Sequence, residues 1–265
     1  MADQALIQSA QPLVPLAWDT QHFGFPVAEI CQPRMSDEGL SQALDLARRR
    51  GVVLVYWNTE AERKLPPGLL QAHGGKCADQ KATFVADLCR DQGRAEVDGG
   101  AAGSRISLYP RVEPTPRLLA LGIAAGEHSR FTRDGRVPRD RFEAMYRIWL
   151  ERSVQGELAD AVLVATLPDA DPEPAGVVTL RQYGQEAHIG LVAVLDSARG
   201  QGVGSCLMKA AHRWMSARGV LRSRVVTQLD NEPACKLYRR SGYRLHDVKH
   251  VYHFWPRAGM VRHGQ

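Results

Sequence analysis

The sequence lacks several features that would assign the chain to a specialised class of protein. Its five cysteines among 265 residues are odd in number and show no C-x-x-C spacing (Cys31, Cys77, Cys89, Cys206 and Cys235), so they indicate neither a disulfide framework nor a zinc site. No stretch approaches the roughly 18 apolar residues of a membrane-spanning helix, and no signal peptide precedes the first predicted helix. We expect a cytoplasmic protein without a metal site or membrane contact, whose thiols are reduced and mostly buried.

A nucleic-acid-binding module is also missing. The net charge is +5 and the pI is about 9.1, but no basic stretch is interleaved with aromatic residues. The arginine runs 48–50 and 239–240 stand at predicted helix ends, where positive charge favours the helix dipole and attracts anionic ligands. The composition, with 44% hydrophobic and 24% charged residues, is typical of a globular protein with a sizeable core. We therefore expect small anionic ligands and no nucleic-acid partner.

The first half of the chain predicts a few separated elements. Ser36 is a predicted N-cap for a helix that ends at Gly51 and buries Leu40, Leu44 and Leu46. Strands are predicted at 52–57, 82–88 and 105–110. The glycine-rich segment 91–104 has few apolar residues, which is typical of a flexible loop or linker. Thr115 and the proline after it predict the start of a further helix.

The second half has a clearer periodicity. Apolar residues at three- and four-residue steps predict a helix over 138–154, and a second helix has a predicted inner stripe of Val203, Leu207, Ala210, Ala211 and Trp214. Strands are predicted at 160–167, 174–183, 186–195, 221–229 and 243–255, with a short helix within 231–242. No repeat interrupts this order, which favours a mixed α/β sheet.

The stretch "RGQGVG" at residues 199–204 lies between a predicted strand and a predicted helix. A P-loop would need a lysine after the last glycine, but Gly204 is followed by Ser205. A dinucleotide fingerprint would need another glycine spacing and an acidic residue about 20 positions later, whereas Asp230 is nearer thirty away. Glycines before a helix N-terminus let the backbone approach an anion. A plain turn between strand and helix is the alternative.

Two motifs at a suitable spacing carry a resemblance to a known family. The loop fits [RQ]-x-x-G-x-[GA], and residues 231–243 fit N-x-x-A-x-x-L-Y-x-x-x-G-[FY]. Both motifs resemble those of the GNAT acetyltransferase superfamily. The resemblance implies a GNAT fold, with a mixed, mostly antiparallel sheet flanked by helices, next to a smaller α/β N-terminal domain. It also implies acetyl-CoA, or another short acyl-CoA, as the co-substrate.

The same resemblance implies roles for individual residues. The pyrophosphate of the coenzyme would lie against the loop, with Arg199, Gly200, Gln201, Gly202, Val203 and Gly204 as the binding residues. Asn231 and Ala234 would contact the pantetheine arm, and Tyr238 would be the general acid that protonates the leaving thiolate. The strand at 191–194 would carry a bulge and offer the backbone of Val192 and Val194. The alternative for Tyr238 is a tyrosine that covers a small core.

Residues 16–30 and 124–154 resemble the bacterial dTDP-fucosamine acetyltransferase family, with its W-D-[ST]-x-F-F-G start and its G-x-x-S-R-F segment. Two departures from that family are His22, where an aromatic residue is expected, and the inserted segment 91–104. Ser129, Arg130 and Phe131 offer a hydroxyl, a cation and a ring, which suit a pyrophosphate and a nucleotide base. The alternative is that Arg130 pairs with a carboxylate such as Glu127 and that Phe131 is core.

We therefore expect an N-terminal α/β domain over 1–112, including the segment 91–104, and a GNAT domain over 113–265. The predicted reaction moves an acetyl group from acetyl-CoA to the amine of a TDP-linked amino-deoxy-sugar, by direct attack in a ternary complex, for surface polysaccharide or glycan precursors. Alternatives are another small amine, such as an aminoglycoside or an amino acid, and a non-catalytic CoA-binding regulatory protein. Glu127, His128 and His188 are open candidates for the general base. A homodimer is a further possibility.

Overall fold

The computed structural model describes residues 12–88, 103–168 and 173–256, and it divides the chain into two compact units. The first unit contains the chain up to Asp79 together with the residues from Lys249 onward, and the second contains Gln80–Val248. Strands β4 (Gly75–Asp87) and β10 (Arg244–Phe254) each run from one unit into the other. The units thus differ from the expected boundary at 112/113, because most of β4 belongs with the second unit and the end of β10 with the first.

The first unit is a small sheet with helices. Its strands β1 (Leu13–Pro15), β2 (Val27–Ile30), β3 (Leu54–Glu60) and the end of β10 follow each other in that order, and only β2 and β3 are parallel. The helices of this unit are α1 (Ala17–Phe23), α2 (Asp37–Arg49) and α3 (Pro67–Ala72). Ser36 caps α2 as predicted, but Leu46 is only half-buried, and the buried stripe of α2 runs through Ala43 and Ala47 instead.

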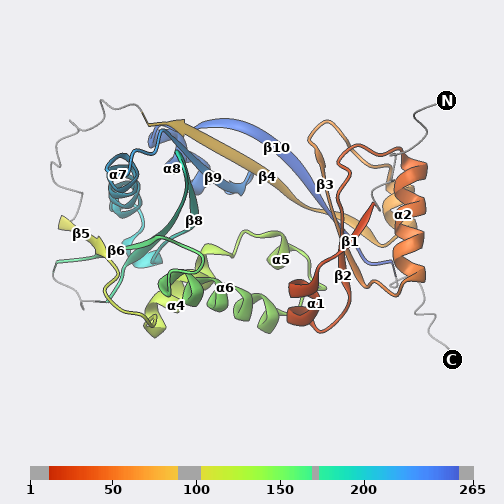
Figure 1. The fold of residues 1–265 in the computed structure, drawn as a ribbon, viewed down its shortest axis with the longest axis horizontal. Helices are drawn as coiled ribbons and strands as arrows, with labels where there is room; N and C mark the ends of the chain where they lie inside the picture. The colour runs from red at the N-terminus through yellow and green to blue at the C-terminus, as the bar shows by residue number, and fades with distance from the viewer. Residues whose placement is uncertain (1–11, 89–102, 169–172, 257–265) are drawn as a thin grey trace, which may run out of the picture. The chain divides into compact units, whose positions relative to one another are not determined.

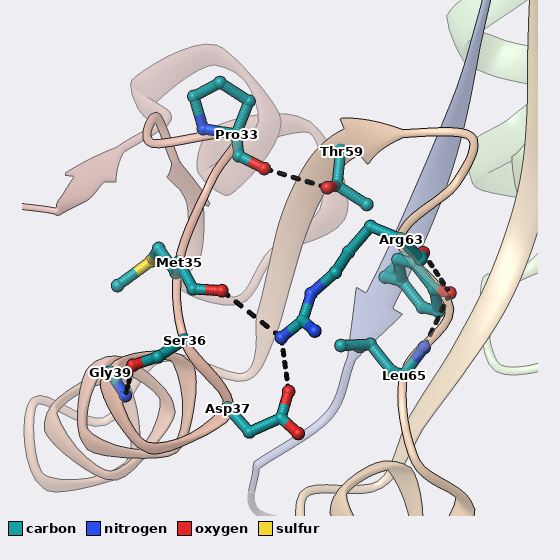
Figure 2. A network of polar contacts seen from close by, with 9 residues as sticks. Pro33, Met35, Ser36, Asp37, Gly39, Thr59, Arg63 and Leu65 are labelled. Carbon is teal, nitrogen blue, oxygen red and sulfur yellow. Dashed lines mark hydrogen bonds and ion pairs between the residues drawn. The ribbon is translucent and has the colours of Figure 1, made fainter.

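A polar network connects the segment before α2 with the end of β3 and the turn that follows it (Figure 2). Arg63 donates a hydrogen bond from Nη2 to the Met35 carbonyl at 3.2 Å and forms an ion pair with Asp37. The hydroxyl of Thr59 donates to the Pro33 carbonyl at 2.8 Å. Because these bonds satisfy the backbone carbonyls that precede α2, they hold the start of that helix against the end of β3.

In the second unit, the first part of β10 is followed by six strands of the ten-stranded sheet, in the order β4–β9–β8–β7–β6–β5. The strands are β5 (Arg105–Leu108), β6 (Ala161–Thr166), β7 (Gly176–Tyr183), β8 (Glu186–Val194) and β9 (Arg222–Gln228). Strands β8 and β9 are parallel, and the other neighbours are antiparallel. This mixed, mostly antiparallel sheet with flanking helices confirms the predicted fold class.

Helices cover both faces of this part of the sheet (Figure 1). On one face, α7 (Val203–Ser216) and α8 (Glu232–Arg240) pack against strand residues such as Leu180 and Val225. On the other face, α4 (Pro116–Ala125) and α6 (Arg139–Val154) pack against residues such as Val164 and Val177. The short helix α5 (Arg130–Arg133) precedes α6. Each face therefore has its own hydrophobic core.

Several local predictions can be compared with the structure. The helices expected over 138–154 and from Val203 onward are confirmed, although Ala210 in the predicted stripe of α7 is only half-buried. The elements β1, α1, β2 and α3 were not predicted. Of the segment 91–104, only the last two residues lie within the described ranges. No helix in the described ranges is long and apolar enough to cross a membrane.

The prediction of mostly buried thiols is wrong for the described cysteines. Cys31 and Cys77 are exposed, Cys206 is half-buried, and Cys235 is buried. Cys89 lies outside the described residues. Both exposed thiols belong to the first unit, next to β2 and on β4, where strand residues alternate between the core and the solvent.

Candidate active site

A β-bulge in β8 shapes the centre of the second unit. The register between β7 and β8 shifts from Val178 opposite Val192 to Leu180 opposite Ile189, so Thr179 faces both Gly190 and Leu191. The Thr179 hydroxyl accepts a hydrogen bond from the Leu191 N–H at 2.8 Å. A Cβ at position 190 would lie 2.7 Å from Thr179 Oγ1, which only glycine avoids. The bulge thus begins one residue before the predicted stretch 191–194.

The extra residue changes which side chains of β8 face which helices. Ala187 and Ile189 pack on the α7 side, whereas Leu191 and Ala193 pack on the side of α4 and α6. The N–H groups of Leu191 and Leu195 both bond toward β7. Because N–H groups alternate along a strand, those of Val192 and Val194 point to the opposite edge, toward β9.

A cavity opens where β8 and β9 stop pairing. The two strands are in parallel register only from Glu186 with Arg222 to Ile189 with Val225, although both continue further. The cavity has a volume of about 380 Å³ and is lined by residues that follow the last pair on each strand, including Val192 and Thr227. Because no strand takes up the N–H groups of β8 there, a ligand in this gap can accept hydrogen bonds from them.

The cavity has two ends along β8, which we name by their residues. The α8 end comprises Val192, Asn231, Ala234 and Tyr238, and the aromatic end comprises Tyr146, Trp149, Arg181, Tyr183 and His188. The α8 end therefore collects three residues of the predicted C-terminal motif. The aromatic end is assembled from α6, β7 and the start of β8.

The glycine loop lies just beyond the α8 end. Gly200 and Gly202 have positive φ angles of 76° and 81°, which allow the chain to turn tightly into the 14-residue helix α7. A Cβ at Gly204 would lie 3.4 Å from Leu237 of α8, an ordinary van der Waals contact, so the start of α7 is a direct neighbour of α8.

The N-terminus of α7 differs from those of three other helices. Side-chain oxygens of Ser36, Thr115 and Asn231 cap α2, α4 and α8, whereas Gly202 gives α7 no side-chain cap. No acidic residue stands in the first turn of α7. The first N–H groups of this helix can therefore bind an external anion such as a phosphate.

Side chains contribute less than backbone to this loop. Arg199 pairs with Asp196 at 2.8 Å, and the Gln201 amide donates to the Ser197 carbonyl at 2.9 Å. Val203 is buried in the core on the α7 side. Since the polar side chains fold back on the turn before the loop, the loop offers a ligand mainly its glycine backbone.

Asn231 and Tyr238 are brought together by α8. The Asn231 Oδ1 accepts the Ala234 N–H at 3.2 Å, which caps the helix, and Asn231 also lines the cavity. Tyr238 is only 4% exposed, and its ring packs against Phe84 and Tyr243. Within the described part of the chain, nothing forms a hydrogen bond with the Tyr238 hydroxyl. Burial raises the pKa of this phenol well above its ordinary value, so it keeps its proton at neutral pH.

The aromatic end is lined by rings and by few charges. Tyr146 and Trp149 stack with their centroids 5.7 Å apart and an interplanar angle of 27°. Arg181 pairs with Asp160 at 3.2 Å, and His188 Nε2 lies 2.7 Å from Glu186 Oε1. Among the described residues, no aspartate or glutamate lines the cavity itself. This end can therefore stack a ring, and its cationic side chain is Arg181.

The residues predicted to bind the acceptor lie beside this cavity rather than in its lining. Ser129 is buried at the start of α5, and the Arg130 guanidinium lies 4.7 Å from the centre of the Phe131 ring. Phe131 also packs on the core of the α4 and α6 face. Arg133 of the same helix pairs at 2.5 Å with Asp230, next to the α8 end.

A larger hollow in the first unit is less suited to a ligand. Its volume is about 520 Å³, and it lies within the network of Figure 2, between Pro33 and Arg63. Its arginines are paired, because Arg34 bonds to Glu60 at 2.7 Å and Arg63 pairs with Asp37. The cavity of the second unit is lined by Asn231, Ala234 and Tyr238 of the predicted motif, so we assign the candidate site to that cavity.

Comparison with known proteins finds a family match within the second unit. Residues 131–243 match the model of the Acetyltransferase (GNAT) family. A dTDP-fucosamine acetyltransferase of Escherichia coli is 37% identical over 128 residues, which are 48% of this chain and 53% of that protein. An aminoglycoside N(6')-acetyltransferase type 1 of Klebsiella aerogenes is 36% identical over 89 residues, which are 31% of this chain and 59% of that protein.

A solved structure extends the comparison to the fold. A GCN5-related N-acetyltransferase from Sphaerobacter thermophilus has a TM-score of 0.57 at 17% identity, and the match covers 91% of this chain and 75% of that one. The chain spans between half and two thirds of the length of the two curated relatives. The match to the Acetyltransferase (GNAT) family model lies within the second unit, and the solved structure is similar to the fold of the chain.

The sequence analysis missed most of the aromatic end. It treated Tyr146 and Trp149 only as part of an apolar stripe, and it did not single out Arg181 or Tyr183. The polar and aromatic ending of β7, "RQY" at 181–183, departs from the apolar run before it and is the one local signal for these residues. Their meeting with α6 depends on tertiary packing, which no local spacing reveals.

Proposed function

We propose that the protein transfers an acetyl group from acetyl-CoA to the amine of a TDP-linked amino-deoxy-sugar, by direct attack in a ternary complex. The observation that carries this proposal is the lining of the aromatic end. Arg181 lies beside stacked rings and no carboxylate of the described residues lines the cavity, a combination that suits an anionic, ring-containing acceptor. The 37% identity to a dTDP-fucosamine acetyltransferase supports the same acceptor class.

The same charges disfavour an aminoglycoside as the main acceptor. Such a molecule carries several ammonium groups, which bind best to carboxylates. Both carboxylates near the aromatic end are already engaged, Asp160 with Arg181 and Glu186 with His188. Because the chain is similar to an aminoglycoside acetyltransferase, aminoglycosides are included among the acceptors to be tested, although that match covers only 31% of this chain.

We assign the coenzyme to the glycine loop and the α8 end. The backbone of residues 199–204 and the uncapped start of α7 would hold the pyrophosphate. The N–H groups of Val192 and Val194 would bond to the pantetheine arm and to the acetyl carbonyl, which they polarise. The Asn231 amide Nδ2 would face the same arm, with Ala234 beside it.

Tyr238 would act as the general acid. As the amine attacks the thioester carbonyl, the C–S bond breaks and the sulfur needs a proton. The Tyr238 hydroxyl lines the cavity, has no hydrogen-bond partner in the described ranges, and stays protonated because burial raises its pKa. Those properties suit a proton donor to a thiolate.

The proposal is tested by measuring thiol release from acetyl-CoA with a panel of acceptors. The panel contains TDP- and UDP-linked amino sugars, aminoglycosides and free amino acids, and mass spectrometry of each product identifies the acetylated amine. We expect release with a TDP-amino sugar well above that with any other class. Preferred turnover of an aminoglycoside or an amino acid would overturn the acceptor assignment. Binding of acetyl-CoA without any turnover would favour a regulatory CoA-binding protein.

A further inference from the structure

We propose that His188 is the general base that removes a proton from the acceptor amine, and that Glu186 positions it. This proposal rests on the proposed function, because it requires an amine acceptor. An ammonium group has no lone pair, so it must lose a proton before it can attack the thioester. The base must therefore face the acceptor in the cavity.

The lining of the cavity leaves one suitable side chain. Five titratable groups of the described residues line it, namely Tyr146, Arg181, Tyr183, His188 and Tyr238. Guanidinium and phenol groups carry their protons at neutral pH, whereas a neutral imidazole has a nitrogen lone pair that accepts one. His188 is therefore the lining residue that can take up a proton there.

The two ring nitrogens of His188 have different surroundings. Nε2 lies 2.7 Å from Glu186 Oε1, two residues earlier on the same face of β8. Nδ1 has no hydrogen-bond partner among the residues that the structure describes. If the carboxylate accepts the Nε2 proton, the Nδ1 lone pair of the neutral ring is left to accept a proton from a ligand in the cavity.

Glu186 is itself held in the charged form. Arg224 of β9 lies with its Nε 3.4 Å from Glu186 Oε1. The hydrogen bond from His188 and the charges of Arg224 and Arg222 lower the pKa of the Glu186 carboxyl. A carboxylate that stays ionised orients the imidazole and stabilises the imidazolium that forms when the ring accepts a proton.

The neighbouring strands complete the surroundings of His188. It is directly opposite Arg181 on β7 and Arg224 on β9, and its ring centre lies 4.8 Å from that of Tyr183. Trp149 of α6 lines the cavity close to Gly190, one position along the same face. The charged and titratable groups around His188 are thus two arginines, one carboxylate and one phenol.

The proton transfers balance in a single sequence. His188 Nδ1 takes one proton from the acceptor ammonium, and the amine nitrogen then bonds to the thioester carbonyl carbon. The C–S bond breaks, and the thiolate takes the Tyr238 proton. The new amide nitrogen returns its second proton to the Tyr238 oxygen, and His188 releases the first proton to solvent.

The other two candidates for the general base, His128 and Glu127, are less suitably placed. His128 is exposed between α4 and α5 and does not line the cavity. Glu127 bonds to the Arg139 guanidinium through both oxygens, at 2.6 and 3.1 Å. His128 therefore serves as a matched control, since a substitution there changes a histidine of the same unit outside the cavity.

The test compares His188→Gln and His188→Ala with His128→Gln in the full-length chain, using TDP-4-amino-4,6-dideoxy-galactose at pH 7. We expect kcat/KM for the acceptor to fall at least 100-fold in both His188 variants, with KM for acetyl-CoA unchanged. This loss, the ratio of wild-type to variant kcat/KM, should shrink by up to tenfold per pH unit as the pH rises. At higher pH a larger fraction of the acceptor amine has already lost its proton to solvent and needs no base. Added imidazole should restore part of the rate to His188→Ala, and His128→Gln should resemble wild type.

Two further readouts separate catalysis from structure. Glu186→Gln keeps a hydrogen-bonding group but loses the charge, and we expect about a tenfold lower kcat from this positioning residue. Thermal unfolding with and without acetyl-CoA checks that each variant folds and binds the donor. A loss below threefold, a loss equal at every pH, or no rescue by imidazole would overturn the role of His188.

Measuring several acceptors distinguishes a failure of the His188 assignment from a failure of the proposed function. If the sugar nucleotide fails and another amine of the panel is acetylated, the acceptor assignment falls, and the His188 variants are measured with that amine. If the sugar nucleotide turns over but the His188 variants match wild type, only the base assignment falls. If no amine is acetylated, both proposals are overturned.

Discussion

The two ends of the cavity are built from different parts of the polypeptide. At the α8 end and the neighbouring glycine loop, backbone N–H groups, positive-φ glycines and a helix N-terminus supply most of the groups that can bind a ligand. At the aromatic end, side chains do so: Tyr146, Trp149, Arg181, Tyr183 and His188. A backbone site fixes one ligand chemistry for every protein with this loop geometry, whereas a side-chain site can change its ligand through a few substitutions. We infer that the donor is set by the fold and the acceptor by this chain's own side chains.

The bulge in β8 connects these two ends. Gly190 and Leu191 share Thr179 as their partner on β7, and the strand turns its following N–H groups toward the gap beside β9. The same bulge leaves His188 before it and Val192 after it, so the two ends lie on either side of one irregularity. A single local feature thus separates the α8 end from the aromatic end.

The largest expected effect separates chemistry from packing at the α8 end. Tyr238→Phe removes a hydroxyl that has no hydrogen-bond partner in the described ranges, so we expect kcat to fall about 100-fold or more with little change in stability. Tyr243→Phe is the matched control, because its hydroxyl bonds to Ser223 at 2.6 Å and to His212 at 3.1 Å. That variant should lose about 1 kcal/mol of stability and keep most of its kcat. Steady-state kinetics and urea unfolding measure both, and an unchanged kcat in Tyr238→Phe would remove its catalytic role.

The second prediction tests whether the glycine loop binds through its backbone. Gly200→Ala and Gly219→Ala both place a side chain at a positive φ, 76° and 71°, with open space around the new Cβ. Each should cost about 1–2 kcal/mol of stability from backbone strain. Only Gly200→Ala should also raise KM for acetyl-CoA, by about tenfold, since it changes the glycine loop before the start of α7, whereas Gly219 lies after the end of that helix. Equal KM values in the two variants would argue against a phosphate site at this loop.

The third prediction sharpens the assignment of the acceptor. We expect Arg181→Ala to raise KM for the TDP-amino sugar about fivefold to tenfold, as for a lost charge-assisted hydrogen bond. Arg130→Ala is its partner experiment, because Arg130 stacks on Phe131 beside the cavity and not in its lining. A smaller effect is expected there. The reverse ranking would move the acceptor from the aromatic end to α5.

The smallest effect concerns alkaline stability. Burial raises the pKa of Tyr238 and of Tyr243, so the folded state binds protons that the unfolded state releases above about pH 10. The stabilisation is therefore complete below that pH and is lost as the pH rises, by at most about 1.4 kcal/mol per pH unit for each tyrosine. Urea unfolding between pH 8 and pH 11 should show this fall, and Tyr238→Phe should reduce its slope. An unchanged slope in that variant would contradict the burial of the hydroxyl.

The sequence was most informative where function depends on local geometry. The cap at Ser36 and the helix start after Gly202 could be predicted because each involves residues a few positions apart. The mixed α/β sheet followed from the order of strands and helices, and its mostly antiparallel pairing from the resemblance to the GNAT superfamily. The bulge was predicted one residue too late, because the pattern "IGLVAV" does not reveal which position lacks a partner on the neighbouring strand.

The aromatic end could not be predicted in the same way. Arg181 and His188 become neighbours only through the antiparallel pairing of β7 and β8, and Trp149 reaches them from a helix more than thirty residues earlier. The compact units also divide the chain elsewhere than at 112/113, since β4 and β10 each span both units. Long-range pairing leaves no periodic signal in a single sequence.

The most direct test of the account is the acceptor preference of an Arg181→Glu variant. The measurement is the ratio of kcat/KM for the TDP-amino sugar to that for kanamycin, in wild type and in the variant. We predict a ratio far above one in wild type and a fall of at least 100-fold in the variant, with KM for acetyl-CoA unchanged, because the charge at the aromatic end has been reversed. An unchanged ratio would contradict the claim that the side chains of this end select the acceptor.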